Sequence, residues 1–198
     1  VKMLIDNADS DPIVRHGGIM ALNGISLRDA GDGAERVADL IRHKSPSVRI
    51  ALCVAMRKLL LSNEPKAAKM KAHAAELVGG LLDDRDLKIV LEAARVVHDV
   101  DVQSQMGKLA GLAKRIDEFV SSDALIRRIV SANVRAGTAE NAKTLVAIAR
   151  NEVLEEDRRI EAIEALGDWA APPERDLVLH DWRPLDRSQR NVLDARQA

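Results

Sequence analysis

The sequence predicts an all-α protein, a right-handed α-solenoid of about five helix pairs with an irregular C-terminal cap. Three observations lead to this prediction. Aromatic residues make up only 2% of the 198 residues, so Ala and Leu must supply most of the buried surface, as they do where thin helices pack closely. Apolar residues recur at helical spacing through residues 1–170. A segment with a basic residue near its start occurs five times, with the period of a helix-pair repeat.

The five repeating segments share one order of residue types. A polar or acidic residue opens each segment, a basic residue follows about four positions later, and large and small apolar residues then alternate. The basic residues lie 34, 39, 39 and 32 residues apart and are Arg15, Arg49, Lys88, Arg127 and Arg159. Asp11-Pro12 and Ser45-Pro46 each place an N-cap acceptor before a proline at the first helical position. Behind Ser45, the apolar positions 48, 52, 55 and 59 form a stripe of α-helical period, which predicts an amphipathic helix.

A second set of helices alternates with these segments. Its apolar stripes lie within residues 34–41, 70–81, 109–120 and 142–153, and the last is entered through Gly137-Thr138. The alternation predicts helix pairs near residues 1–28, 33–62, 66–101, 105–137 and 139–168. The array therefore spans residues 1–170, and residues 171–198 form an irregular extension.

Several of these segments resemble HEAT repeats, an armadillo-like family of α-solenoids. The resemblance rests on D-P-x-V-R at residues 11–15, S-P-x-V-R at residues 45–49 and the A-x-x-A-L ending at residues 162–166, and it covers nearly all of residues 1–170. In that family the aspartate–arginine signature supports hydrogen bonding between successive repeats. The resemblance thus implies a structural ladder made of Asp11, Arg15, Arg49, Lys88, Arg127 and Arg159. Leu87-Lys88 replaces V-R, and Asp157-Arg158-Arg159 lacks the hydrophobic residue, so we expect a weaker ladder in those two repeats.

The helical period fails after Leu166-Gly167. Pro172-Pro173 ends regular structure, and Pro184 blocks a further helix. The last repeat of a solenoid leaves an apolar face open unless something covers it. We expect this segment to fold back as a cap through Trp169, Leu177 and Trp182, and an aromatic-lined ligand site is the alternative. Residues 186–198 read as the start of a next helix or as a frayed end.

The same region carries a second resemblance. The stretch EAIEALGDWAAPPERDLVLHDWRPL, residues 161–185, resembles the HEAT segment of large secreted proteins from Planctomycetes and related bacteria. Those proteins often join a sorbosone/glucose-dehydrogenase-like β-propeller and a c-type cytochrome domain to HEAT repeats. The resemblance implies a periplasmic or extracellular multidomain oxidoreductase, with its propeller and haem outside this chain. Because the chain begins at Val1, without an initiator Met and part-way into a helical pattern, we expect it to be a piece of a longer protein.

The sequence offers no residue set with the spacing of a known catalytic or metal site. No two of the five histidines are three or four residues apart, so no helix presents a pair of metal ligands. Gly17-Gly18 and Gly79-Gly80 fit neither phosphate-loop pattern and predict close helix packing or a kink. Cys53 lies in the apolar run IALCVAM and is predicted to be a small buried residue. We therefore expect no catalytic residue, metal ligand or cofactor in this segment.

The charge pattern bears on the kind of partner. With 30 basic and 31 acidic residues, the chain has no overall field that would attract nucleic acid or an anionic membrane. No apolar run approaches the roughly 20 residues of a membrane span. The second helices of HEAT pairs line the concave side of the array. We expect them to offer a partner surface of mixed sign, formed by Arg57, Glu92, Arg95, His98, Arg135 and Glu161.

Two functions follow from this surface. The first is a non-catalytic scaffold that binds a protein or positions neighbouring domains of the same chain. The second is a HEAT-like enzyme that uses the concave groove, as DNA glycosylases or lyases would. A basic groove with a buried carboxylate would favour the enzyme, and a mixed or apolar groove would favour the scaffold.

Overall fold

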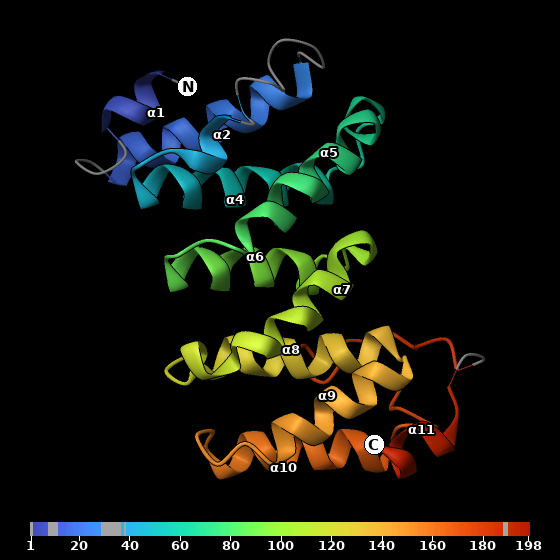
Figure 1. Ribbon diagram of the computed structural model, residues 1–198. Coiled ribbons are helices and arrows are strands. Elements are labelled where there is room, and N and C mark those ends of the chain that lie inside the picture. Colours follow the sequence, from blue (N-terminus) through green and yellow to red (C-terminus); the bar gives the residue numbers. More distant parts are fainter. Residues whose placement is uncertain (1, 8–11, 29–36, 38, 188–189) are drawn as a thin grey trace. The chain divides into compact units, whose positions relative to one another are not determined.

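The protein is helical throughout the part that its structure describes. A computed structural model describes residues 2–7, 12–28, 37, 39–187 and 190–198 (Figure 1). Within these residues the chain forms helices and no β-strand, which confirms the all-α prediction. The chain divides into two compact units, Val1–Gln105 and Met106–Ala198, each of which has its own core.

The first unit is built around one central helix. It contains α1 (Lys2–Asn7), α2 (Pro12–Arg28), the 3-10 helix η1 (Asp39–Arg42), α4 (Pro46–Leu61), α5 (Pro65–Leu81) and α6 (Leu87–Asp99). The central helix α4 packs against α2, α5 and α6. Its predicted stripe, Val48, Leu52, Ala55 and Leu59, is buried. The Ser45 hydroxyl accepts a hydrogen bond from the Val48 N–H, so the predicted N-cap of this helix is confirmed.

In the second unit the helices pack around α9. The helix α7 (Gln103–Gly111) crosses the boundary between the two units and continues into the 3-10 helix η2 (Leu112–Phe119). The helices α8 (Asp123–Ala136), α9 (Ala139–Ala149), α10 (Glu156–Gly167) and α11 (Val192–Gln197) follow. The helix α9 contacts α8, α10 and α11. Gly137 ends α8 in the left-handed region at φ 67°, and Thr138 caps α9.

Two details differ from the sequence-based expectation. The stripes at residues 34–41 and 109–120 were expected on α-helices, yet residues 39–42 and 112–119 form the 3-10 helices η1 and η2, and Arg115 breaks the helical conformation at φ −119°. Residues 34–36 and 38 lie outside the described residues, while Val37 and residues 109–111 are α-helical. The extension after residue 170, expected to be irregular, contains α11, which begins where the Asn191 side chain accepts from the Leu193 N–H. Of the two readings for residues 186–198, α11 agrees with the start of a further helix.

The Gly79-Gly80 pair lies in α5 where two other elements approach closely. A Cβ added at Gly79 would fall on the Gln105 side chain, and one added at Gly80 would lie 2.5 Å from Cδ1 of Ile41. Glycine at these two positions leaves room for the Gln105 and Ile41 side chains where they lie. Of the two roles expected for this pair, close packing or a kink, the close packing is confirmed.

Candidate interaction surface

Two of the predicted ladder arginines bind carboxylates of the following helix pair. Arg49 Nε and Nη2 donate to the two carboxylate oxygens of Asp84 at 2.7 and 3.1 Å, and Nη1 donates to the Lys44 carbonyl. Arg127 Nε donates to Glu161 Oε1 at 3.1 Å. The partners are 35 and 34 residues further along the chain. Each contact thus spans one repeat period.

The other ladder positions lie in different surroundings. Arg15 is half-buried in α2, and Lys88 is exposed at the start of α6. Arg159 is half-buried in α10, and its Nε is buried with no hydrogen-bond partner among the described residues. Asp11 lies outside the described residues. A link of the same span that sequence reasoning missed joins η2 to the turn after α9, because Asn151 Nδ2 donates to Asp117 Oδ1 at 2.6 Å across 34 residues.

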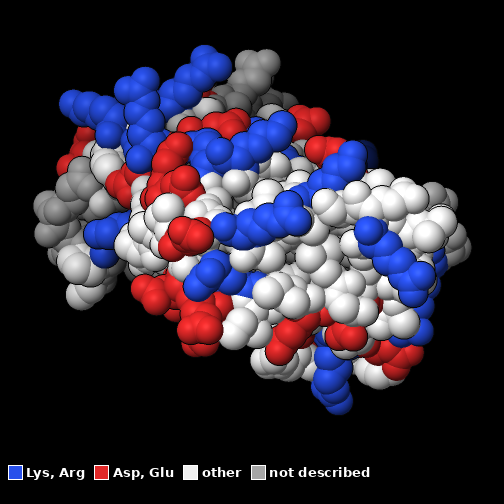
Figure 2. Space-filling view, turned by 60° about the horizontal axis from the view of Figure 1, so that its bottom comes forward, with Lys and Arg blue, Asp and Glu red and all other residues white. Residues whose placement is uncertain are grey.

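Four of the six residues predicted for the partner surface are at least partly exposed. Arg57 is exposed on α4. Glu92 and Arg95, both half-buried, form an ion pair of 3.3 Å along α6. Glu161 is half-buried and binds both Arg127 and Arg158. In Figure 2, Lys and Arg are interspersed with Asp and Glu over the face drawn. Surfaces of mixed sign suit a protein partner better than a polyanion.

The other two residues are not on the surface, which corrects the prediction. His98 is fully buried, and its Nδ1 lies 2.9 Å from Asp99 Oδ1. It follows Val90 and Ala94 at steps of four, which places it on the buried face of α6. The Arg135 side chain is 6% exposed, because the segment after residue 171 covers it and Asp176 pairs with it.

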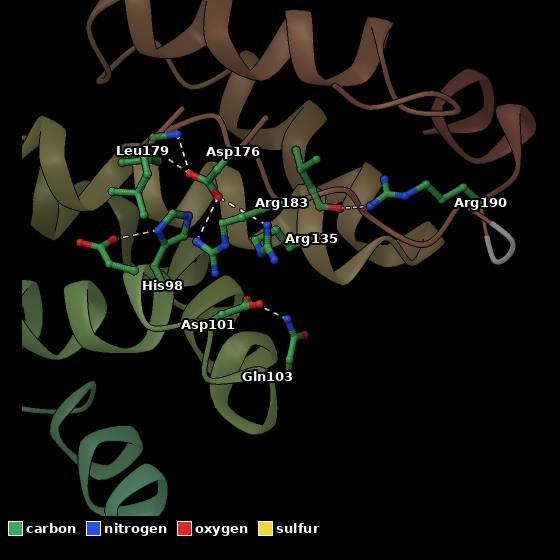
Figure 3. A network of polar contacts seen from close by, with 11 residues as sticks. His98, Asp101, Gln103, Arg135, Asp176, Leu179, Arg183 and Arg190 are labelled. Carbon is green, nitrogen blue, oxygen red and sulfur yellow. Dashed lines mark hydrogen bonds and ion pairs between the residues drawn. The ribbon is translucent and has the colours of Figure 1, made fainter. Parts of the chain in front are cut away.

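A buried carboxylate holds this returning segment against α8. The Asp176 side chain is completely buried, and its Oδ1 accepts from the N–H groups of Val178 and Leu179 at 2.9 Å each (Figure 3). Its Oδ2 pairs with Arg135 at 3.4 Å and with Arg183 at 3.5 Å. A buried charge is tolerated when cations and hydrogen bonds surround it in this way. Sequence reasoning missed Asp176. An Asp side chain that accepts hydrogen bonds from the N–H groups two and three residues further on is nevertheless a known turn motif.

The backbone around Asp176 forms a small hairpin. The Arg183 N–H donates to the Glu174 carbonyl and the Asp176 N–H to the Asp181 carbonyl, both at 2.9 Å, and Arg175 forms a β-bridge with Trp182. Arg127 Nη2 donates to the Leu177 carbonyl at 2.9 Å. One arginine of α8 therefore contacts both α10, through Glu161, and the hairpin.

The predicted cap over the last helix pair is wrong in its placement. Trp169 is buried, with the Arg190 guanidinium 4.9 Å from its ring centre, and Leu177 is half-buried. Trp182, however, is 64% exposed. The segment packs on α8, where Arg135 can neutralise Asp176, and α10 keeps Ile160 and Ile163 exposed at 41% and 56%. The two tryptophans therefore lie in different surroundings, one buried and the other exposed.

Partial burial also affects Arg190, which links this region to α8. Its Nη2 donates to the Val134 carbonyl, and Nη1 donates to the Trp169 carbonyl at 3.4 Å. Burial lowers the pKa of Arg190 from its ordinary value, because the surroundings disfavour the charged form. Guanidinium groups nevertheless stay protonated in proteins, so Arg190 still acts as a cation.

The hollow that best fits the enzyme reading lies in the first unit. It measures about 620 Å³, and several basic side chains line it, among them Arg42, Lys44 and Arg85. Its least exposed carboxylate belongs to Asp84, and both oxygens of that group are already bound by Arg49, while Oδ1 also accepts from the Asp86 N–H. This geometry holds the turn before α6 in place. It leaves neither carboxylate oxygen of Asp84 without a hydrogen-bond donor.

The remaining reactive group is Cys53. Burial raises the pKa of its thiol, and the carboxylates of Glu92 and Asp84 raise it further. The thiol therefore stays protonated and is a poor nucleophile. The described residues contain no cluster of three His, Cys, Asp or Glu side chains that could hold a metal ion. None of the described helices has both the length and the apolar character needed to cross a bilayer.

Comparison of the chain with protein-family models, curated proteins and solved structures finds no significant match. The fold and the contacts define an all-helical protein in which polar side chains link helix pairs about 34 residues apart.

Proposed function

We propose that this chain is a non-catalytic scaffold of the HEAT-repeat kind. It forms a right-handed α-solenoid of about five helix pairs and binds a protein, or positions neighbouring domains of the same chain. The observation that best supports this proposal is the set of contacts that span 34 or 35 residues, Arg49–Asp84, Asn151–Asp117 and Arg127–Glu161. Repeat proteins are stabilised by such contacts between neighbouring units.

The chemistry of the surface supports a protein partner. Arg57 is exposed, and Glu92 and Arg95 pair with each other, so the predicted surface has both signs of charge and no concentration of one. Specific protein recognition uses complementary charges of this kind, whereas DNA binding requires several cations directed at phosphates. The resemblance of residues 161–185 supports a periplasmic or extracellular oxidoreductase as the parent protein.

The alternative, a glycosylase- or lyase-like enzyme, gains one supporting observation from the basic hollow of the first unit. It is the weaker candidate because the buried carboxylate there, Asp84, is fully engaged by Arg49 and the Asp86 N–H. A general acid or base must reach the atom to which it transfers a proton.

Two measurements test the proposal. Small-angle scattering should give a radius of gyration above the roughly 16 Å expected of a compact protein of this length. The adjoining domains of the parent protein, produced separately, should bind the chain in calorimetry. Binding should be lost in Arg57→Glu/Arg95→Glu and kept in the control Lys114→Glu/Arg150→Glu, which makes the same change of charge at exposed positions. Cleavage of an abasic or alkylated DNA duplex, abolished by Asp84→Asn, would instead establish the enzyme.

A further inference from the structure

The helix α10 has one face that no described part of the chain covers. Ile160 and Ile163 are 41% and 56% exposed, and Gly167 continues the same row four residues later. Large apolar side chains in such a row usually face another element of the protein. Because Gly167 has no side chain, a second helix can approach closely at this position.

One border of this face is acidic. The exposed carboxylates of Asp157 and Glu164 lie three residues before and four residues after Ile160, on the same side of the helix. Beside Ile160 there is an open hollow of about 270 Å³, lined by Arg127, Asp157, Arg158, Ile160, Glu161 and Glu164. Arg127 and Arg158 both bind Glu161. The cations of the hollow are therefore engaged with Glu161, while carboxylates line its outer edge.

The hollow continues a surface on which a chain segment already docks. Arg127 contacts Glu161 at the hollow and the Leu177 carbonyl of the hairpin, so the hollow begins where the hairpin leaves α8. The hairpin covers Ser131 and Arg135 of α8. When the basic residues Arg127 and Arg159 are aligned, the matching positions of α10 are 163 and 167, which are exposed. The same face is thus occupied on one helix and uncovered on the next.

We propose that the uncovered face of α10 docks a short helical segment of a protein partner that carries a large apolar side chain beside lysine or arginine. The apolar side chain packs on Ile160 and Ile163, and the cation enters the hollow between Asp157 and Glu164. This inference rests on the proposed scaffold function and adds a second surface and a partner class to it. The chain's net charge of −1 is too small to attract cationic segments generally, so the pairing depends on this local cluster.

A designed peptide pair tests the proposal. The probe is a fluorescein-labelled, 18-residue amphipathic peptide with Leu on one face and Lys along its borders, and the matched peptide has Glu in place of every Lys. Fluorescence anisotropy at physiological salt should show binding of the Lys peptide, and the Glu peptide should bind at least about tenfold more weakly. Ile160→Ser/Ile163→Ser and Asp157→Lys/Glu164→Lys should each weaken binding of the Lys peptide by about tenfold.

Matched control variants distinguish a loss of binding at the α10 face from a general effect of removing an apolar side chain or reversing a charge. Leu61→Ser removes another exposed apolar side chain, and Glu76→Lys/Glu140→Lys reverses two exposed charges elsewhere. Both should bind the Lys peptide as the unchanged protein does. Urea unfolding of every variant verifies that each is folded, and solvent-exposed substitutions of this kind should leave it so.

Three results would overturn the proposal even if the Lys peptide binds. They are equal binding of the two peptides, equal losses in the control variants, and self-association of the chain that Ile160→Ser/Ile163→Ser abolishes in sedimentation. The last result would make a second copy the occupant. If the peptide fails to bind while the adjoining domains still do, this surface is refuted and the scaffold function stands.

Discussion

The two tryptophans give the most direct test of how the C-terminal region is packed. Both were expected to cover the last helix pair, yet Trp169 is 1% exposed and Trp182 is 64% exposed. Replacing a fully buried Trp by Ala costs about 3–5 kcal/mol, from lost burial and the cavity left behind. The lost contact of the Arg190 guanidinium with the ring adds about 0.5–1 kcal/mol. An exposed Trp contributes little, so Trp182→Ala should change the free energy of unfolding by less than about 0.5 kcal/mol.

Urea unfolding followed by circular dichroism measures both changes. The Trp169 indole N–H is buried without a hydrogen-bond partner among the described residues, so Trp169→Phe removes that unpaired group and should cost less than Trp169→Ala. Iodide should quench the fluorescence of Trp169→Ala, in which Trp182 remains, and should hardly quench Trp182→Ala. Equal losses of stability in the two alanine variants, or equal quenching, would refute this account of the packing.

Three further predictions concern buried polar groups. Asp176→Ala should cost about 3–5 kcal/mol, because it leaves the buried Arg135 without that carboxylate, and thermolysin should cut before Leu177 and Leu179 faster than in the unchanged protein. A double-mutant cycle on Arg49 and Asp84, whose side chains are 13% and 8% exposed, should give a coupling of about 0.5–3 kcal/mol in urea unfolding, and a value of zero would contradict the ladder. Because the folded state raises the pKa of Cys53, the unfolded thiol ionises first as the pH rises. Relative to Cys53→Ala, stability should thus be constant below about pH 8.5 and fall by about 1.4 kcal/mol per pH unit above it; a pH-independent difference would contradict the burial.

Much of the local structure could be predicted from neighbouring residues. Ser45 caps its helix, the pair Gly137-Thr138 ends one helix and begins another, and Gly79-Gly80 lies at a close approach, all as expected. These features depend on backbone conformation and on interactions within a few residues. The departure from α-helix at residues 112–119 has a local cause as well, because Arg115 leaves the helical conformation inside a pattern that still looks helical.

The candidate surface was harder to predict. His98 shares the row of Val90 and Ala94, so its spacing already pointed to the buried face of α6. Arg135 is buried by a segment far along the chain, which helical spacing cannot show. The exposed row on α10, with Ile160 and Ile163, was missed because the C-terminal segment was expected to cover it. The sequence could have shown that Asp157 and Glu164 lie on one side of α10. It could not have shown that the face beside them is uncovered.

The sequence by itself determined the helices, their caps and the positions of the basic residues in each repeat. Helical periodicity and capping depend on residues a few positions apart, so both can be predicted from the amino-acid sequence. Only the tertiary structure decided which carboxylates Arg49 and Arg127 bind and where the C-terminal segment docks. Asp176 is 41 residues from Arg135 along the chain, yet the two side chains are paired. A buried charge must have a partner in space, and sequence spacing does not say which cation will be within reach.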